Sequence, residues 1–322
     1  MKKKLWMKIG IGVVIVLIAA LFFVGNYLVD FAIVRKENPQ DVAPASAVTA
    51  ENQSVIDKNR QEIERQKEQW IAQVQREDAE IISDDGLHLK GDVFWTDTKS
   101  HRWVLAIQGY TGRRQDMQNI ASFYGLQGYN VLTPDMRSHG ESEGTYIGMG
   151  WLDRKDVIKW IQYIIDFDQE AEIILHGVSM GGATVMMTAG EDLPEQVKWI
   201  VEDCGYTSVW DIFSDELRYL FHLPDFPVLY AADAVSRIRA GYGFQNASSI
   251  EQLKKSQVPV LFIHGSEDTF VHTDMVYELY EACPTQKDLL VVEGAGHGEA
   301  YLMDPDLYFD TVFEFLTTYC FA

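Results

Sequence analysis

EIILHGVSMGG, residues 172–182, is the stretch that decides the fold of this chain of 322 residues. Its first five residues form a short, largely apolar run typical of a buried strand, and the residues from Met180 onward are typical of a helix. Between them, Gly177-Val178-Ser179-Met180-Gly181 matches G-x-S-x-G, a sharp strand-to-helix turn that exposes a serine hydroxyl. The flanking glycines leave space for close packing around a strained serine. This setting favours an activated serine over a chance glycine-rich turn.

Runs rich in Val, Ile and Leu alternate with helical stretches on both sides of this motif. Such alternation is typical of an α/β fold, a mostly parallel sheet with helices on both faces. We expect strands at residues 103–107, 130–133, 172–176, 199–201, 259–264 and 289–292. We expect helices at residues 115–126, 150–167, 180–190, 273–282 and 306–318. The interval 206–257 is longer than one crossover helix needs, which predicts an inserted lid.

A serine hydroxyl is a weak nucleophile, so a histidine must take its proton and a carboxylate must fix the tautomer of that histidine. The strand predicted at 259–264 leads into Asp268, and the strand predicted at 289–292 leads into His297. We therefore predict a catalytic triad of Ser179, Asp268 and His297. The alternatives from the sequence are other histidines and carboxylates near predicted strands: His139, His264, Glu267 and Asp203.

From about Ile81 onward the chain resembles the α/β-hydrolase superfamily, in which the triad follows the order serine, acid, histidine. The resemblance rests on the elbow, on residues 265–268 (GSED), on Gly296-His297 and on residues 108–110 (QGY). Residues 135–142 (DMRSHGES) are similar to the D-x-R-x-H-G-x-S turn of serine aminopeptidases and monoacylglycerol lipases. We expect Arg137 and Ser142 to tie this loop together and Asp135 to cap it.

The resemblance also implies an oxyanion hole formed by the backbone N–H groups of Tyr110 and Met180. Two such donors lower the activation barrier of acyl transfer by several kcal/mol, because they point at the negative charge that develops on the oxygen in the transition state. Gln108 stands where the family usually has histidine. We expect the backbone geometry to be kept and any role of that histidine side chain to be absent.

Composition indicates a globular protein, 47% hydrophobic, with a net charge of −21 from 27 Lys and Arg against 48 Asp and Glu. Such a surface repels polyanions, so nucleic acid is not an expected partner. Cys204, Cys283 and Cys320 lie far apart without a C-x-x-C pair, and we expect no metal and no cofactor. Buried free thiols are the favoured interpretation, with a disulfide between Cys283 and Cys320 as the alternative.

Residues 9–29 form a run of 21 residues without a formal charge, which is long enough for a transmembrane helix. Four lysines precede this run within residues 1–8, whereas Asp30 follows it, so we expect a cytoplasmic N-terminus and an extracytoplasmic remainder. A cleaved signal peptide is the alternative. Its small-x-small sites, at 43–45 and 45–47, lie far beyond the apolar run, which favours an uncleaved anchor in the cell membrane.

Residues 30–76 are predicted to hold a linker and an amphipathic helix, and residues 77–322 the hydrolase domain. Within 51–78, apolar side chains recur at steps of seven and four: Ile56, Ile63, Trp70 and Val74. We expect this helix to dock on the hydrolase domain, with a coiled-coil dimer as the alternative. No oligomeric state is favoured by the sequence alone.

Aromatic side chains in the predicted lid are candidates for an apolar substrate pocket, although they could equally form the core of the lid. The four candidate substrate-binding residues are Trp210, Phe213, Tyr219 and Phe221, with Phe226 and Tyr230 nearby. We expect hydrolysis of a small carboxylic ester through acyl-Ser179. A peptidase or acyltransferase would use the same residues, and a tethered, non-catalytic binding or scaffold protein is the alternative of another class.

Overall fold

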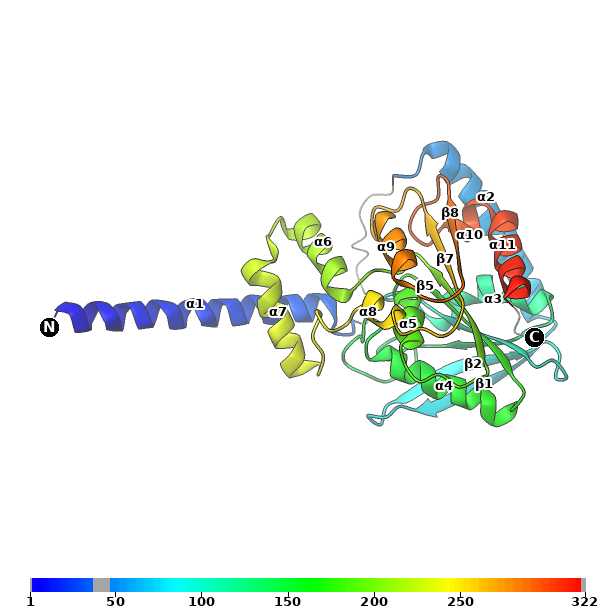
Figure 1. Cartoon of the computed structure of the whole chain (residues 1–322), viewed down its shortest axis with the longest axis horizontal. Coiled ribbons are helices and arrows are strands. Elements are labelled where there is room, and N and C mark those ends of the chain that lie inside the picture. The colour runs from blue at the N-terminus through cyan, green and yellow to red at the C-terminus, as the bar shows by residue number, and fades with distance from the viewer. Residues whose placement is uncertain (1, 37–46, 320–322) are drawn as a thin grey trace.

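The computed structural model describes residues 2–36 and 47–319 (Figure 1). Its centre is an eight-stranded sheet in the order β1-β2-β4-β3-β5-β6-β7-β8. β2 pairs antiparallel with β1 and β4, and the six strands from β4 to β8 in that order pair in parallel. The strands are β1 (Gln75–Ile82), β2 (His88–Trp95), β3 (Arg102–Ile107), β4 (Asn130–Pro134), β5 (Glu172–Val178), β6 (Val197–Asp203), β7 (Val260–Gly265) and β8 (Lys287–Val292). The predicted mostly parallel sheet is confirmed.

Helices cover both faces of this sheet, because successive strand residues point to opposite sides. Leu105 and Ile107 face one layer and Val104 and Ala106 face the other. The first layer consists of α4 (Asp153–Phe167), α5 (Met180–Ala189), α8 (Ser249–Leu253) and α9 (Asp274–Ala282). The second consists of α3 (Gln118–Leu126), preceded by the 3-10 turn η1 (Arg114–Met117), with α10 (Ala300–Met303) and α11 (Pro305–Thr318).

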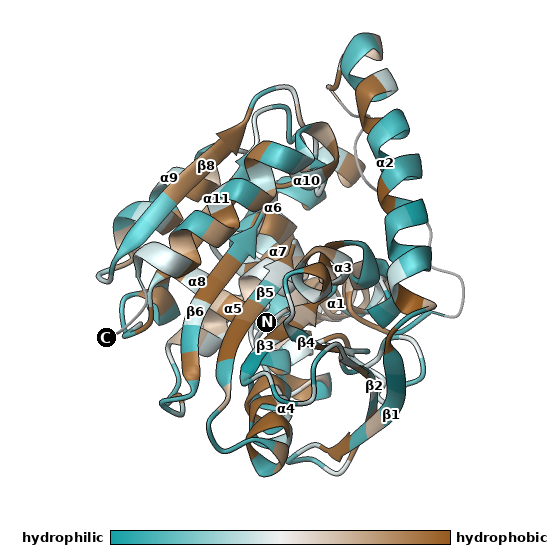
Figure 2. Ribbon diagram, turned by 90° about the vertical axis from the view of Figure 1, so that its right-hand side faces the viewer, coloured by the Kyte–Doolittle hydropathy of each residue, from teal (hydrophilic) through white to brown (hydrophobic). Residues whose placement is uncertain are grey.

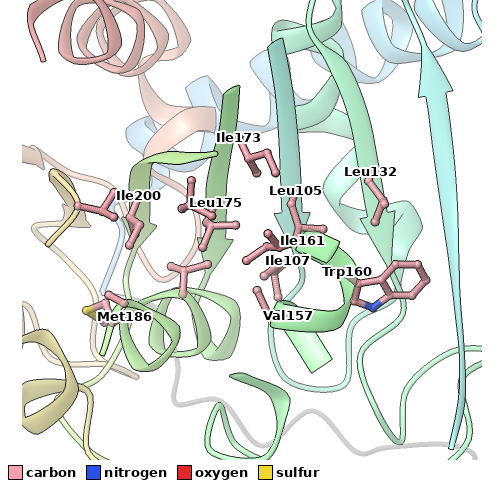
Figure 3. Packing of buried hydrophobic residues seen from close by; sticks show 14 of the residues in the cluster. Leu105, Ile107, Leu132, Val157, Trp160, Ile161, Ile173, Leu175, Met186 and Ile200 are labelled. Carbon is pink, nitrogen blue, oxygen red and sulfur yellow. The ribbon is translucent and has the colours of Figure 1, made fainter. Parts of the chain in front are cut away.

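The first layer forms the larger apolar core (Figure 3). Val157, Trp160 and Ile161 of α4 pack beside Leu105 and Ile107 of β3, all of them buried. This packing fixes the position of β3 along its neighbouring strands. It therefore also fixes where the carboxyl ends of β3 and β5 lie at the edge of the sheet.

Two strands, the edge strand β1 and its neighbour β2, were not predicted from the sequence. β1 (QREDAEII) buries only Ala79 and Ile81, so it carries no apolar run, and it is held by antiparallel pairing with β2. For the same reason, the helix expected within 51–78 is shorter in the structure. The observed helix α2 (Ala50–Ile71) ends at Ile71, and the strand begins at Gln75.

The helix α2 docks on the hydrolase domain through three of the four side chains that its heptad-like spacing indicated, whereas Val74 lies beyond the end of the helix. Ile56, Ile63 and Trp70 are buried against α3 and α10. The indole of Trp70 lies so close to Gly125 that any Cβ there would clash with it. Figure 2 shows α2 on the outside of the domain, with a hydrophobic stripe and a hydrophilic outer face. The residues available for a coiled coil are therefore already used for docking.

The interval predicted as a lid contains α6 (Val209–Phe221) and α7 (Asp225–Arg239). The N-terminal helix α1 (Lys2–Ala32) projects from the molecule, and its last turns pack against α7 (Figure 1). Among the described residues, one helical stretch, Trp6–Ala32, is long and apolar enough to cross a membrane. The possible cleavage sites at 43–45 and 45–47 lie, apart from Ala47, outside the described residues.

The described cysteines are buried free thiols. Cys204 lies at the end of β6 and Cys283 follows α9, with its Sγ 3.3 Å from Thr285 Oγ1. Cys320, the other half of the possible disulfide, lies outside the described residues.

Candidate active site

Ser179 occupies the turn between β5 and α5 in a strained conformation, with φ 59° and ψ −118°. A Cβ at Gly177 would lie 2.1 Å from the carbonyl oxygen of Gly181, and a Cβ at Gly181 would lie 2.1 Å from that of Ile107. Only glycine fits at either position. The turn is also held by the Ser179 N–H, which donates to the Asp203 carbonyl oxygen at 2.8 Å. The serine hydroxyl therefore projects from the carboxyl edge of the sheet.

The loops after β7 and β8 bring the two predicted partners to this serine. His297 Nε2 lies 2.8 Å from Ser179 Oγ, and His297 Nδ1 lies 2.7 Å from Asp268 Oδ2. Because an ionised carboxylate only accepts, the geometry favours the tautomer in which Nδ1–H donates to Asp268 and Nε2 accepts from the serine. This is the arrangement that a serine nucleophile requires.

Asp268 is shared by two histidines. His264 Nε2 lies 2.9 Å from the Val271 carbonyl oxygen and 3.2 Å from Asp268 Oδ2, while the N–H groups of Phe270 and Val271 donate to Oδ1. Burial alone would raise the pKa of Asp268, but the charge of His297 and the hydrogen bonds of both histidines hold that pKa well below its usual value. The acid therefore stays ionised.

The rival carboxylates have other partners. Asp203 Oδ2 accepts from the Tyr308 hydroxyl at 2.9 Å, and burial raises the pKa of Asp203 to about 6. Glu267 accepts from the neighbouring Ser266 hydroxyl at 3.4 Å. Neither of these contacts involves the imidazole of His297.

The rival histidine His139 is fixed in one tautomer. Its Nε2 accepts from the Thr111 N–H at 3.1 Å, so its Nδ1 donates to the Arg137 carbonyl oxygen at 2.8 Å. Burial lowers the pKa of His139. Its imidazole is therefore neutral and already committed to two backbone groups.

One set of possible metal ligands lies at the site itself. Donor atoms of Cys204, Asp268 and His297 lie within 4.8 Å of one another. Burial raises the pKa of the Cys204 thiol well above its usual value, and a thiol must lose its proton to bind a metal strongly. Since His297 and Asp268 are already hydrogen-bonded to each other, these residues do not fit a metal centre.

The two residues predicted for the oxyanion hole lie beside the serine. Met180 is the first residue of α5, where backbone N–H groups have no partner within the helix. Tyr110 follows β3, and both residues line the same cavity as Ser179. With its amide oriented to satisfy both partners, Gln108 donates to the Pro134 carbonyl at 2.7 Å and accepts from the Met136 N–H at 2.9 Å. Gln108 thus anchors the loop that carries Tyr110.

The segment 135–142 is a structural loop. The Arg137 guanidinium pairs with Asp156 and Asp85. Ser142 Oγ donates to the Asp135 carbonyl oxygen at 2.6 Å, and Asp135 accepts from the backbone N–H groups of Arg114 and Glu141. These contacts agree with the tying and capping roles expected for this turn.

An apolar cavity of about 90 Å³ opens beside Ser179. Of the four predicted substrate-binding residues, Phe213 and Phe221 line it. Trp210 instead packs edge-on against Tyr230 with ring centroids 4.8 Å apart, and Tyr219 is 50% exposed; neither lines the cavity. The reason is helical geometry, because residues 213, 217 and 221 share one face of α6.

Another wall of this cavity could not be predicted from the sequence. Leu28, Phe31 and Ala32 of α1 line it together with the lid and the elbow. A hydrophobic run long enough to span a bilayer predicts a membrane helix over its whole length, and nothing in the sequence of its last turns indicates a second role. One charged side chain, Glu216 of α6, also lines the cavity.

Comparisons with known proteins identify relatives of this arrangement. The sequence model of the prolyl oligopeptidase family matches residues 115–320. The uncharacterized protein YqkD of Bacillus subtilis is 30% identical over 190 residues, which cover 59% of this chain and 62% of that protein. The chain thus spans less than two thirds of the length of that relative.

Solved structures share the fold. The esterase Pf2001 of Pyrococcus furiosus superposes with a TM-score of 0.62 and 25% identity, covering 76% of this chain and 93% of the esterase. Est1E of Butyrivibrio proteoclasticus, solved with bound ferulic acid, has a TM-score of 0.60 and 20% identity over 75% of this chain and 98% of its own.

The assignment of the acid can be tested with a fluorophosphonate, which reacts with an activated serine. We expect Asp268→Asn to slow the labelling of Ser179 by about 10⁴-fold, because an amide cannot hold His297 in the tautomer that accepts the serine proton. The control is Asp203→Asn, an isosteric replacement of a carboxyl group whose pKa is raised by burial. This variant should be labelled at a rate close to that of the unaltered protein. The opposite ranking of the two variants would make Asp203 the acid.

Proposed function

Because the chain belongs to the prolyl oligopeptidase family and is a serine hydrolase with the α/β-hydrolase fold, we propose that it hydrolyses carboxylic esters through an acyl-Ser179 intermediate. The single observation that carries this proposal is the imidazole of His297, hydrogen-bonded to Ser179 Oγ at 2.8 Å and to Asp268 at 2.7 Å.

In the proposed mechanism, Ser179 Oγ attacks the ester carbonyl carbon while its proton passes to His297 Nε2. The ionised Asp268 stabilises the resulting imidazolium, and the N–H groups of Tyr110 and Met180 donate to the oxyanion. The C–O bond to the alcohol then breaks, and His297 gives its proton to the leaving alcohol. Water, deprotonated by the same imidazole, attacks the acyl-serine and releases the carboxylic acid.

The cavity beside Ser179 supports an ester with an apolar acyl group. Its walls are formed mainly by aliphatic and aromatic side chains of the lid and of α1. The first of the similar solved structures, at 25% identity, is itself named an esterase. A charged peptide would have to be desolvated in such a cavity, at a cost that an apolar acyl chain does not incur.

A second candidate, an aminopeptidase, is favoured by Glu216. This residue lines the cavity, and its Oε2 is buried without a hydrogen-bond partner among the described residues. Burial, with a contribution from the neighbouring Asp215, raises the pKa of Glu216 to about 7. An ionised Glu216 could pair with the amino group of an aminoacyl substrate, whereas a neutral Glu216 suits an uncharged ester.

We also propose that α1 is an uncleaved membrane anchor and that the hydrolase domain lies outside the cytoplasm. Lysines precede the apolar run, and the side chains from Trp6 to Phe23 are largely exposed. Cleavage near residue 45 would separate α1 from the domain. It would thereby remove the buried side chains of Leu28, Val29 and Ile33 and one wall of the cavity.

The nucleophile is tested with Ser179→Ala. We expect the hydrolysis of p-nitrophenyl esters to fall by about 10⁶-fold, because no other group in the proposed mechanism can form the acyl intermediate. The control Ser54→Ala changes an exposed serine of α2 and should retain full activity. If folded, unaltered protein neither hydrolyses these esters nor reacts with a fluorophosphonate, the scaffold alternative replaces the enzyme.

The choice between ester and aminoacyl substrates is tested by the pH dependence of KM. Because Glu216 is neutral below about pH 7, the KM for an uncharged ester should rise severalfold between about pH 6 and about pH 8, as a buried carboxylate forms beside the substrate. Glu216→Gln should abolish this rise, and Glu281→Gln on the exposed face of α9 should not. The peptidase would be favoured by the opposite result with aminoacyl amides. Their KM would then fall as the pH rises over the same range in the unaltered protein, and would not fall in Glu216→Gln.

The location is tested with a membrane-impermeant fluorophosphonate. We expect intact cells to label Ser179 as strongly as lysed cells, because the proposed orientation places the serine outside. The labelled chain should also stay with the membrane after a carbonate wash, and Ser179→Ala serves as the labelling control. Labelling that requires lysis would reverse the orientation, and labelled protein free in the medium would show that α1 is removed.

A further inference from the structure

The last turns of α1 are part of the hydrolase domain. Val29 and Ile33 are fully buried against the lid and the loop before α4. The helix α7 crosses α1 at Gly25, where a Cβ would lie 2.7 Å from the carbonyl oxygen of Ala231. Only glycine allows this approach. The Arg239 guanidinium of α7 then binds α1 through Asn26 and Asp30, at 2.6 and 2.7 Å.

The chain that follows α1 is fixed to the loops around the active site. The Tyr110 hydroxyl donates to the Ala32 carbonyl oxygen at 2.7 Å, and the Ile147 N–H donates to that of Ile33 at 2.7 Å. Arg35 donates from its backbone to Thr145 and from its guanidinium to the carbonyl oxygens of Gly140 and Ser142. The distance and orientation of Ser179 relative to α1 are therefore set by the fold, and not by a flexible tether.

The exposed part of α1 has the length of a bilayer core. The 18 residues from Trp6 to Phe23 span roughly 27 Å, with Lys8 as the one charged side chain, close enough to the N-terminal end to reach the headgroups. Contacts with the lid begin just after Phe23. Leu28, the first cavity-lining residue of α1, lies roughly 8 Å further along the axis, at the level of the outer headgroup layer.

An apolar surface of the lid lies at the same level. We call it the lid apex, and it consists of exposed side chains around the turn between α6 and α7: Tyr219, Leu223, Phe226 and Tyr230. Phe226 is 74% exposed. In Figure 1 this turn is the part of the domain that reaches furthest along α1 toward its free end. Exposed Tyr and Phe side chains next to a membrane span are typical of the membrane interface.

A continuous apolar path joins α1 to the cavity. Tyr27, 57% exposed, contacts Phe221 edge-on, and Phe31 contacts the same ring, with centroid distances of 6.4 and 5.4 Å. Phe31 and Phe221 both line the cavity beside Ser179. A chain that leaves the bilayer along α1 would thus meet apolar surface all the way to the nucleophile.

We propose that the substrate is a lipid ester resident in the bilayer, whose acyl chain enters the cavity along α1 and the lid apex. This inference rests on the proposed ester hydrolase function. Ser179 takes the acyl group, the headgroup alcohol leaves with the proton carried by His297, and water releases the fatty acid to the membrane. The net charge of −21 disfavours anionic headgroups, so an uncharged lipid ester fits best.

The test uses the full chain reconstituted in phosphatidylcholine vesicles. Two substrates are compared, a long-chain glycerol monoester embedded in the vesicles and the water-soluble p-nitrophenyl acetate. We expect the double variant Leu223→Asp, Phe226→Asp to lose about tenfold or more of its rate on the embedded ester, since two charges at the lid apex oppose its insertion. Its rate on p-nitrophenyl acetate should be unchanged, because neither residue lines the cavity.

The matched control is Leu126→Asp, a substitution of a 59% exposed leucine at the end of α3, away from α1. It should change neither rate. A second variant, Phe31→Ala, shortens the wall that α1 contributes and should lower the ratio of long-chain to short-chain kcat/KM by about tenfold.

Equal rates of the double variant and the unaltered protein on the embedded ester would overturn the inference, as would an unchanged chain-length ratio in Phe31→Ala. Either result would leave ester hydrolysis itself in place. Failure of the unaltered protein to hydrolyse both esters is a different outcome, and it would remove the proposed function together with the inference that rests on it.

Discussion

The turn between β5 and α5 is the constraint on which the rest of this structure depends. Ser179 is held at φ 59°, a conformation that costs about 1–3 kcal/mol for a residue other than glycine. The surrounding backbone supplies the compensation. Gly177 and Gly181 allow contacts that no side chain would permit, and the Ser179 N–H is bonded to the end of β6. The buried parallel strands keep these elements in register, so the hydroxyl has one position.

The second feature is a buried carboxylate with two imidazole neighbours. Burial by itself raises the pKa of Asp268, and the contacts with His297 and His264 hold that pKa well below its usual value. Asp203, at the end of the adjacent strand, has a tyrosine hydroxyl as its partner and a raised pKa instead. Two carboxylates at the same edge of the sheet thus differ in pKa, because Asp268 has two imidazole partners and Asp203 has none within hydrogen-bonding distance. This difference is what separates a proposed catalytic acid from a structural one.

The helix α1 combines two properties that are usually separate. Its first part is exposed and apolar over the length of a bilayer core, and its last turns are buried in the lid. The close approach of α7 at Gly25 and the hydrogen bond from Tyr110 to Ala32 join these two parts to the active site. In the proposed arrangement, α1 is an anchor that also forms a wall of the cavity, and it would couple the position of the domain at the membrane to the shape of the cavity beside Ser179.

The sequence by itself determined the superfamily, the serine hydrolase class and the six parallel strands, because G-x-S-x-G and buried Val, Ile and Leu runs are local signals. It also named the three residues of the hydrogen-bonded triad, since strand ends meet at one edge of a parallel sheet. It missed β1, whose residues are largely exposed and form no apolar run, and it also missed the neighbouring β2. It included Trp210 and Tyr219 among the cavity residues. Only the tertiary structure decided which side of α6 faces Ser179 and that Leu28, Phe31 and Ala32 complete the cavity. In this cavity α1 meets Ser179 and α6, which lie more than a hundred positions further along the chain, and no local pattern encodes such packing.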